Sequence, residues 1–470
     1  MTEYLFELKE LSRRIGAKHV SFSRNTGFSS VSIDSRNVTD GCLFFALEGE
    51  KTDGHCFVED AFNKGAAAAV VREGKLNSFN LENAAKKAGR DLIVVENTLK
   101  GLQDSAKAYL CKFPKLRKIG ITGSCGKTTT KEIAAAIISA EKNTVMNRGN
   151  LNSETGLPLS IFEIRENHEV GIFELGMNKK GEISSTASIL KPNIAVITNI
   201  GRAHIGNIGS IDEIVNEKKC IFSFMNEDDI ALIPQIEKYR DTLALGAGGI
   251  VKFYGSGSFD ELEQTRSLGL YGTEIIWAGE KIRFALPGNH SLNDAIAAIA
   301  IAKEINVSNK AIKRGLESVK PLFGRLEILE GRAVVIRDCY NANPESTAQS
   351  LEFCDSLDWK GRKVYIFGDM LELGDASQSA HTELGDALCE SGAQMVFLFG
   401  RETKAAATSL EKKNKPYFHT DDIEKLSAAV DGYIQTGDLV LLKGSRLCAL
   451  ERLSGMLVNK STNAEAACVS

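Results

Sequence analysis

The sequence lacks several features that would assign it to a secreted or membrane-bound class of protein. None of its ten cysteines forms a C-x-x-C pair, and they are scattered from Cys42 to Cys468, so we interpret them as reduced thiols in a reducing cytosol. The opening residues, MTEYLFELKELSRR, contain no long apolar segment and no small-residue cleavage site, and we expect no secretory signal. No uninterrupted apolar run of about 18 residues occurs, so we expect a cytoplasmic protein without a membrane partner.

Strong charge asymmetry and internal repeats are absent as well. The net charge is −4 and neither half of the chain is strongly basic, which disfavours a nucleic-acid partner, because such a partner would require a basic surface. With 43% hydrophobic and 25% charged residues, the chain can bury several cores, which argues against wholesale disorder. At roughly 100–200 residues per domain, the length predicts about three domains, and we expect a monomer.

Short apolar strands alternate with helical stretches in three parts of the chain, which predicts an α/β fold. The central part should contain a mostly parallel, doubly wound sheet, and the near-continuous apolar strands of the third suit a sheet covered on both faces. The expected strands are CLFFAL (42–47) and AAAAVV (66–71), then RKIGIT, VGIFEL, NIAVITNI and DIALIP, then AVVIRD, KVYIFGD, MVFLFG and LVLLKGS. The predicted domains are 1–97, 98–319 and 320–457, followed by a tail at 458–470.

The strongest motif is GITGSCGKTTT, residues 120–130, between a predicted strand and a predicted helix. Gly123 and Gly126 would let backbone N–H groups approach phosphate oxygens, and the helix N-terminus would add its positive dipole end. Lys127 could then reach the β/γ-phosphates and the Thr128 hydroxyl could hold Mg²⁺. A standard phosphate loop has glycine where this chain has Ile121, which indicates a variant class. The register of Gly, Lys and Thr disfavours a simple glycine-rich turn without a ligand.

Two titratable residues downstream are candidates for a metal site, and a third charged residue follows them. Glu174 ends the strand VGIFEL and His204 follows the strand NIAVITNI, so both should emerge at the carboxyl edge of the sheet, where a second metal ligand is expected. Taken singly, each is more often a surface residue, or in the case of histidine a satisfied core residue. Lys218, in NEKKCIF, fits a solvated charged surface when judged by pattern alone.

These segments resemble the ordered motifs of the Mur ligase family, over roughly residues 30–451. The motifs are GITGSCGKTTTKE, FELGMNKKGEI, ITNIGRAH, LPGNHSLNDAIAA, GRLE, DCYNANPES, FGDMLELG and KGSR, with DSR (34–36) and DGHCFVEDAFNKGA (53–66) near the N-terminus. YNANP, GDMLELG and KGSR together are similar to the members that add D-alanyl-D-alanine. Two segments depart from the pattern, because Ser153 stands where a second asparagine is expected and IGNIGS (205–210) is a loose version of its segment.

The resemblance implies an N-terminal UDP-substrate domain, a central P-loop ATPase domain and a Rossmann-like C-terminal domain. It implies ATP-dependent joining of D-Ala-D-Ala to the terminal carboxylate of UDP-N-acetylmuramoyl-tripeptide through an acyl phosphate, with two Mg²⁺ ions and a CO2-derived carbamate on Lys218. The implied catalytic residues are Lys127, His204 and Lys218, and the implied metal ligands are Thr128, Glu174, His204 and the Lys218 carbamate. The implied ATP contacts are Gly123, Ser124, Cys125, Gly126, Lys127, Thr128, Thr129, Asn289, Asn293, Arg325 and Asp338. The implied substrate contacts are Ser35, Arg36, Asn150, Asn152, Asn341 and Asn343.

Two other functions stay open on the sequence. The first is a sister ligase, either another Mur member or a folylpolyglutamate-synthetase-like enzyme, which would differ in the amine that it accepts. The second is a nucleotide-binding regulatory or scaffolding protein without catalysis. The residues that argue against it by being intact are Lys127, Thr128, Glu174, His204 and Lys218. The identity of the third residue of the acceptor peptide is not indicated by the sequence.

Overall fold

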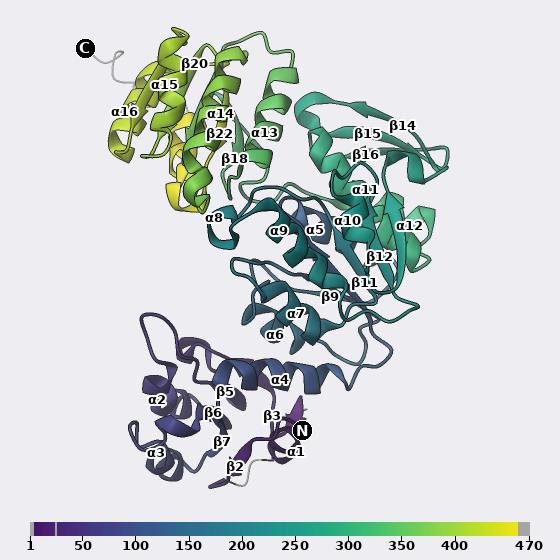
Figure 1. Cartoon of the computed structure of the whole chain (residues 1–470), viewed down its shortest axis with the longest axis vertical. Coiled ribbons are helices and arrows are strands. Elements are labelled where there is room, and N and C mark those ends of the chain that lie inside the picture. The colour runs from purple at the N-terminus through teal and green to yellow at the C-terminus, as the bar shows by residue number, and fades with distance from the viewer. Residues whose placement is uncertain (1–3, 24–25, 459–470) are drawn as a thin grey trace, which may run out of the picture.

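The computed structural model describes residues 4–23 and 26–458, which form three α/β units in chain order (Figure 1). The N-terminal unit lies at one end of the long axis and the C-terminal unit at the other, with the central unit between them. The predicted α/β class is confirmed. Within the described residues no helix is both long and apolar enough to cross a membrane. The predicted tail lies outside the described residues except for Val458, which ends the last helix.

The first unit is built on a five-stranded sheet. In spatial order its strands are β2 (Lys18–Val20), β7 (Asp91–Val95), β6 (Ala68–Arg72), β5 (Cys42–Phe45) and β4 (Ser30–Ser32). Strands β4 to β7 run parallel and β2 is antiparallel. All four residues of β5 are buried, as expected of an apolar strand covered on both faces, and the two strands predicted here are confirmed. The remaining elements are β1 (Phe6–Glu7), β3 (Gly27–Phe28), α1 (Leu8–Arg14), α2 (Val58–Asn63) and α3 (Leu81–Ala88).

Helix α4 (Thr98–Leu110) connects the first unit to the second. Its N-cap is Asn97, whose side chain accepts a hydrogen bond from the backbone N–H of Lys100. Leu102 and Tyr109 on its apolar face belong to one continuous core with residues of both sheets. The first unit is therefore packed against the second rather than tethered to it, and the domain boundary at residue 97 stays a prediction.

The central sheet has six strands, four of which were predicted, and all of them run parallel where a mostly parallel sheet was expected. Its spatial order is β13 (Ile250–Tyr254), β12 (Ile230–Pro234), β11 (Ile194–Ile197), β8 (Arg117–Thr122), β10 (Val170–Glu174) and β9 (Thr144–Met146). One face is covered by α5 (Lys127–Ile138), α11 (Asn289–Glu304) and α12 (Asn309–Ser318). The other is covered by α4, α6 (Gly156–Ile161), α7 (Glu182–Leu190) and α9 (Ile211–Lys219). The chain order reverses beside β8, and ligands of such sheets bind beyond the carboxyl ends of the strands at this point.

A three-stranded antiparallel sheet between β13 and α11 was not predicted from the sequence. It consists of β14 (Leu262–Ser267), β15 (Thr273–Trp277) and β16 (Glu280–Phe284). Five of the six residues of β14 are exposed, so that strand carries no apolar pattern to detect. Trp277 and Ile282 of the other two strands are buried in the same core as α12.

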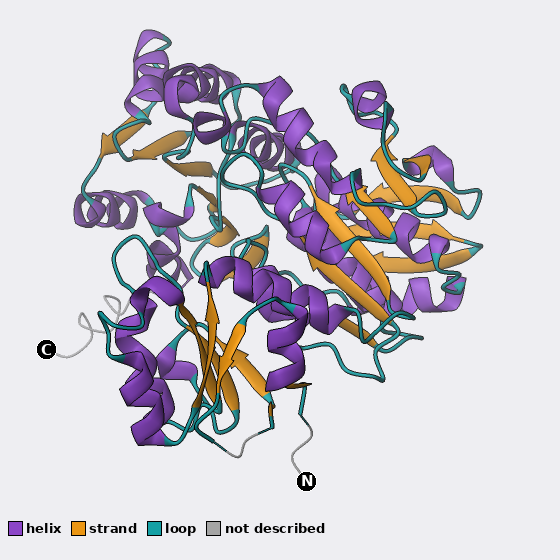
Figure 2. Ribbon diagram, turned by 60° about the horizontal axis from the view of Figure 1, so that its bottom comes forward, coloured by secondary structure: helices purple, strands orange, loops and turns teal. Residues whose placement is uncertain are grey.

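The C-terminal unit is a second six-stranded sheet, shown with the others in Figure 2. Its strands are, in spatial order, β17 (Glu327–Glu330), β18 (Val334–Asp338), β22 (Leu439–Lys443), β19 (Lys363–Gly368), β20 (Met395–Phe399) and β21 (Tyr417–Thr420). All pairs are parallel except β17–β18, and cores lie on both faces. The four predicted strands are confirmed, whereas β17 and β21 were not predicted. The helices are α13 (Pro344–Ser356), α14 (Ser377–Glu390), α15 (Lys404–Lys412), α16 (Ile423–Tyr433) and α17 (Ser454–Val458).

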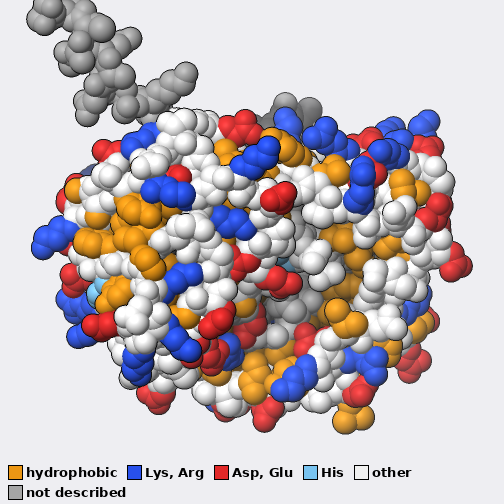
Figure 3. All heavy atoms as spheres, turned by 90° about the horizontal axis from the view of Figure 1, so that it is seen from above, with side chains coloured by type: hydrophobic (Ala, Val, Ile, Leu, Met, Phe, Trp, Pro, Cys, Tyr) orange, Lys and Arg blue, Asp and Glu red, His pale blue; other side chains and the backbone are white. Residues whose placement is uncertain are grey.

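Figure 3 shows one face of the molecule, over which acidic and basic side chains are mixed. The surface of this face is hollowed near its middle.

Candidate active site

A cavity of about 750 Å³ is lined by residues of both the central and the C-terminal units. Its central wall comes from the loop after β8, the carboxyl ends of β10 and β11, and the first turns of α11. Its other wall comes from the segments around β18 and β22. The sequence-predicted residues that line it are Ser124, Cys125, Gly126, Lys127, Thr128, Thr129, Asn150, Asn152, Glu174, His204, Asn293, Arg325, Asp338, Asn341 and Asn343.

The predicted phosphate loop joins β8 to α5 and requires glycine at two positions. Gly123 has φ +152° and a Cβ there would lie 1.9 Å from the Thr198 hydroxyl oxygen. Gly126 has φ +77° and a Cβ there would lie 2.1 Å from an Asp294 carboxyl oxygen. Both positions combine a positive φ with backbone packed directly against a side chain, which excludes every other residue type. The glycines therefore shape the loop as the sequence motif predicted.

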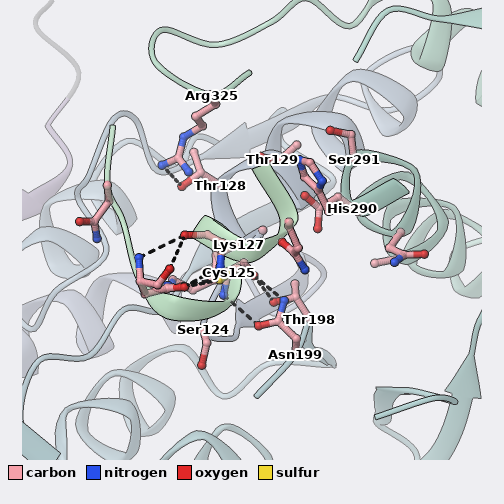
Figure 4. A pocket seen from close by; sticks show the side chains of 18 of the residues that line it. Ser124, Cys125, Lys127, Thr128, Thr129, Thr198, Asn199, His290, Ser291 and Arg325 are labelled. Carbon is pink, nitrogen blue, oxygen red and sulfur yellow. Dashed lines mark hydrogen bonds between the residues drawn. The ribbon is translucent and has the colours of Figure 1, made fainter. Parts of the chain in front are cut away.

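The side chains of Lys127 and Thr128 meet the loop backbone and residues from two other segments (Figure 4). Lys127 Nζ donates to the Gly123 carbonyl at 2.9 Å. The Thr128 hydroxyl donates to Glu174 Oε2 at 2.7 Å and accepts from Arg325 Nη2 at 3.0 Å. Arg325 belongs to the segment that leads into the third unit, so the loop is touched by a cation from across the cavity. The carboxylate, hydroxyl and two cations form a site suited to phosphate groups.

Glu174 is 2% exposed and its position is fixed by two asparagines. Asn147 accepts from the Glu174 N–H at 2.9 Å and donates to the Glu174 carbonyl at 3.0 Å. Asn152 Nδ2 donates to Glu174 Oε1 at 2.7 Å. Asn152, predicted as a substrate contact, thus orients the carboxylate in this structure, and Asn147 was missed by the sequence analysis. A buried carboxylate beside a hydroxyl offers the oxygen ligands that Mg²⁺ takes together with phosphates and water, so the residues present fit that ion.

Lys218 is buried, which contradicts its interpretation as part of a solvated charged surface. Its side chain on α9 is 1% exposed and Nζ donates to the Gly123 carbonyl at 3.0 Å. Burial and the nearby Lys127 charge hold the pKa of this amine well below its ordinary value. Two amines, those of Lys127 and Lys218, therefore converge on one backbone carbonyl beneath the loop.

His204 lines the cavity as predicted, but its ring is held by the third unit. Its Nδ1 lies 2.6 Å from Glu372 Oε2, and this contact lowers the pKa of Glu372. Glu372 belongs to the GDMLELG motif. Among the described residues no three His, Cys, Asp or Glu side chains are grouped as a metal site. The Glu174–His204 metal pair therefore stays a prediction, whereas Thr128 and Glu174 are in direct contact.

Helix α11 brings one of its two predicted residues to the cavity, together with residues that were not predicted. His290, Asp294 and Ala297 line the cavity at the i, i+4, i+7 spacing of one helical face. Asn293 borders this stripe and also lines the cavity, but Asn289 at the first helical position is exposed and outside the lining. Asp294 was missed. It lies beneath Gly126, accepts from the Thr130 hydroxyl at 3.3 Å, and burial raises its pKa to about 8.

The third unit contributes an ion pair of which only the acidic partner was predicted from the sequence. Asp338, predicted as a ribose contact, is 2.7 Å from Lys443 Nζ and also accepts from the Ser350 hydroxyl. Lys443 is 2% exposed. It was not predicted, although it lies in the KGSR motif, which could have identified it. The carboxylate lines the cavity with both of these partners in place.

Asn343, predicted near the incoming dipeptide, is the N-cap of α13. Its Oδ1 accepts from the Ser346 N–H at 2.8 Å, and its Nδ2 lies 3.2 Å from the Cys125 Sγ of the phosphate loop. Burial raises the pKa of the Cys125 thiol. Asn341 is exposed and its Oδ1 accepts from the Ala342 N–H.

Two predicted substrate residues lie in the first unit, outside the cavity. Ser35 is buried and its carbonyl accepts from Lys64 Nζ at 3.0 Å, whereas Arg36 is exposed and paired with Asp34. Their assignment to the UDP end of the substrate stays a prediction.

Three family models match the chain in the order of its units. They are the Mur ligase family, catalytic domain, at residues 28–110, the Mur ligase middle domain at 121–302, and the Mur ligase, glutamate ligase domain, at 324–446. The chain is 41% identical to the UDP-N-acetylmuramoyl-tripeptide–D-alanyl-D-alanine ligase of Treponema pallidum, over 92% of this chain and 94% of that one.

Solved structures agree with this likeness. MurF from Acinetobacter baumannii superposes with a TM-score of 0.86 at 29% identity, covering 96% of this chain and 98% of that one. MurF ligase from Thermotoga maritima in complex with ADP superposes with a TM-score of 0.77 at 27% identity, covering 91% and 96%.

Proposed function

Because this chain belongs to the Mur ligase family of ATP-dependent peptide ligases, we propose that it joins D-alanyl-D-alanine to UDP-N-acetylmuramoyl-tripeptide. The terminal carboxylate of the tripeptide is activated by ATP, and the new amide bond yields ADP and phosphate. The relatives at up to 41% identity carry the name of this reaction, and the product belongs to peptidoglycan precursor synthesis. One observation carries the proposal above all, namely that Arg325 of the third-unit side reaches Thr128 of the phosphate loop at 3.0 Å.

The first step brings two anions together. The substrate carboxylate attacks the γ-phosphorus, the bond to the β-phosphate oxygen breaks, and an acyl phosphate and ADP result. Lys127 and Arg325 lie where they would offset the negative charge that repels the carboxylate from the triphosphate. The N-terminal end of α5 adds a fixed dipole. ATP contacts are proposed for Ser124, Cys125, Thr129, Asn289, Asn293 and Asp338, of which Asn289 lies outside the cavity lining.

A magnesium ion would supply Lewis-acid polarisation of the phosphate oxygens when bound at Thr128 and Glu174. The Thr128 hydroxyl donates to Glu174 at 2.7 Å, so both oxygen ligands lie side by side at the loop. A second ion is proposed near His204 and Lys218. Carbamate formation on Lys218 requires a neutral amine, and burial of Nζ beneath the loop favours that form.

The second step requires the exclusion of water. The amine of the dipeptide attacks the acyl carbon, phosphate leaves, and a proton is released from the amine. An acyl phosphate that water reached would be hydrolysed, which favours a site enclosed by two units. Asn341 and Asn343 are proposed to lie beside the dipeptide, Asn150 and Asn152 beside the sugar or peptide, and Ser35 and Arg36 beside the UDP group. We also propose a monomer in the cytoplasm.

Phosphate release measured with ATP, UDP-tripeptide and D-Ala-D-Ala, omitting each in turn, tests the proposal. Release should require all three, and mass spectrometry should show a pentapeptide product. A sister ligase or a folylpolyglutamate-synthetase-like enzyme would instead accept a single amino acid such as glutamate. Nucleotide binding without phosphate release in every substrate set would indicate a regulatory protein and contradict the proposal.

A further inference from the structure

The segment after β11, residues 198–202, is in contact with both the phosphate loop and the third unit. On the loop side, residues of this segment form hydrogen bonds with most polar groups of Ser124 and Cys125. The Ser124 hydroxyl donates to the Gly201 carbonyl at 2.9 Å and accepts from the Gly201 N–H at 2.8 Å. The Cys125 N–H donates to Asn199 Oδ1 at 2.9 Å. A shift of the loop would therefore displace residues 199–201.

On the other side Arg202 contacts two helices of the third unit. Its backbone N–H and its Nε both donate to the Glu345 carboxylate, at 2.9 and 3.1 Å. Its Nη2 lies 2.9 Å from Glu383 Oε2. Two donors on one carboxylate fix the orientation as well as the distance. A Cβ on Gly201 would lie 2.7 Å from the Glu345 carboxyl group, so the backbone itself is in close contact with this side chain.

Glu345 lies in the first turn of α13, two residues after the N-cap Asn343, which touches Cys125 of the phosphate loop at 3.2 Å. The contacts therefore form a closed circuit from the loop to residues 199–202, to Glu345, to Asn343 and back to the loop. The proposed dipeptide-binding segment 341–343 is part of this circuit.

We propose that Arg202 is a positioning residue that couples occupancy of the phosphate loop to the binding of the dipeptide. This inference rests on the proposed function. The nucleotide sets the position of Ser124 and Cys125, residues 199–201 follow, and Arg202 transmits that position to the start of α13. The dipeptide then binds tightly only when the nucleotide is bound to the phosphate loop. The acceptor amine is therefore not held in the site before the nucleotide arrives.

The exposure of the Arg202 ion pairs favours a role in coupling ligand sites over a contribution to the free energy of unfolding. Arg202 and Glu345 are each about a third exposed and Glu383 is 56% exposed. Ion pairs of this exposure contribute little to folding, whereas coupling between two ligand sites is typically worth a factor of about 5 to 150 in affinity. Removing Arg202 should therefore change ligand linkage far more than the free energy of unfolding.

Binding of D-Ala-D-Ala is measured by calorimetry on the whole protein, with and without a non-hydrolysable ATP analogue, in the presence of UDP-tripeptide. For the wild type the analogue should tighten dipeptide binding by about tenfold, and the dipeptide should tighten analogue binding by the same factor. Arg202→Ala and Glu345→Gln should each bring the ratio of the dipeptide Kd without the analogue to the dipeptide Kd with it close to one. The double variant should give the same ratio as either single variant. Arg202→Lys should restore only part of it, because lysine keeps the charge but loses the planar fork.

Arg266→Lys is the matched control, since Arg266 forms its ion pair with Glu274 inside the small antiparallel sheet. It should leave the ratio unchanged. The inference is overturned if Arg202→Ala keeps the wild-type ratio, or if the wild type shows no linkage at all. Failure of the proposed function is distinguishable, because wild-type protein would then release no phosphate with the dipeptide, before any variant is compared.

Discussion

Replacing Asp294 by asparagine should flatten the pH dependence of stability of this protein. Asp294 is 8% exposed, and burial raises its pKa from 3.8 to about 8 in the folded state. An acid whose pKa is raised by folding binds more protons folded than unfolded, so stability falls as the pH rises between the two values. Each pH unit in that window costs about 1.4 kcal/mol, which amounts to about 3 kcal/mol between pH 5 and pH 7.

Asp294→Asn keeps an oxygen to accept the hydrogen bond from Thr130 and cannot ionise. At pH 5 the variant should already be more stable by about 1.6 kcal/mol, because the wild-type carboxyl is protonated when folded but largely ionised when unfolded at that pH. By pH 7 this difference should have grown by a further ~3 kcal/mol. The measurement is urea unfolding from pH 5 to pH 8 without nucleotide, followed by the fluorescence of Trp277, which is buried in the same core as α11.

Asp260→Asn, a change at an exposed carboxylate, is the control and should leave the profile unchanged. If the gap between Asp294→Asn and the wild type is the same at pH 5 and pH 8, the carboxyl is ionised throughout this range. In that case burial beneath Gly126 does not keep it protonated, and the reasoning is wrong.

Three further changes test the reaction itself. Lys127→Ala should lower ligation by about a hundredfold or more with the fold intact, since the amine beside the Gly123 carbonyl is lost, and Lys127→Arg should not restore it; near-normal phosphate release would contradict the assignment. Asp338→Ala should raise the KM for ATP several-fold and more than that for UDP-tripeptide, and a change confined to the dipeptide KM would place Asp338 in the acceptor site. Lys218→Ala should lose most activity, with partial rescue by short carboxylic acids in the buffer, and wild-type turnover at limiting Mg²⁺ would exclude the carbamate.

The sequence by itself determined the class of fold and the position of the phosphate loop. Both depend on local patterns, since buried parallel strands are continuously apolar and a loop that wraps phosphate needs glycine at fixed positions. Gly123 and Gly126 are required for that reason, and the strand and helix that flank them lie where the motif predicted. The small antiparallel sheet escaped detection because β14 is almost entirely exposed.

Only the tertiary structure decided which polar side chains meet. The charged segment around Lys218 has the composition of a solvated surface, and nothing local shows that α9 buries this one amine under a loop 95 residues away. On α11 the rotation of the helix toward the cavity decides that Asp294 lines it and Asn289 does not, and a motif with several polar residues does not fix that rotation.

The same holds for contacts between units. Glu372 contacts His204 and Glu345 contacts Arg202, and both pairs join residues more than 140 positions apart in the chain. Such pairs form because two folded units dock at one particular angle. Local sequence sets the strands and helices of each unit, but the docking angle depends on the packing of whole surfaces, which no single segment encodes.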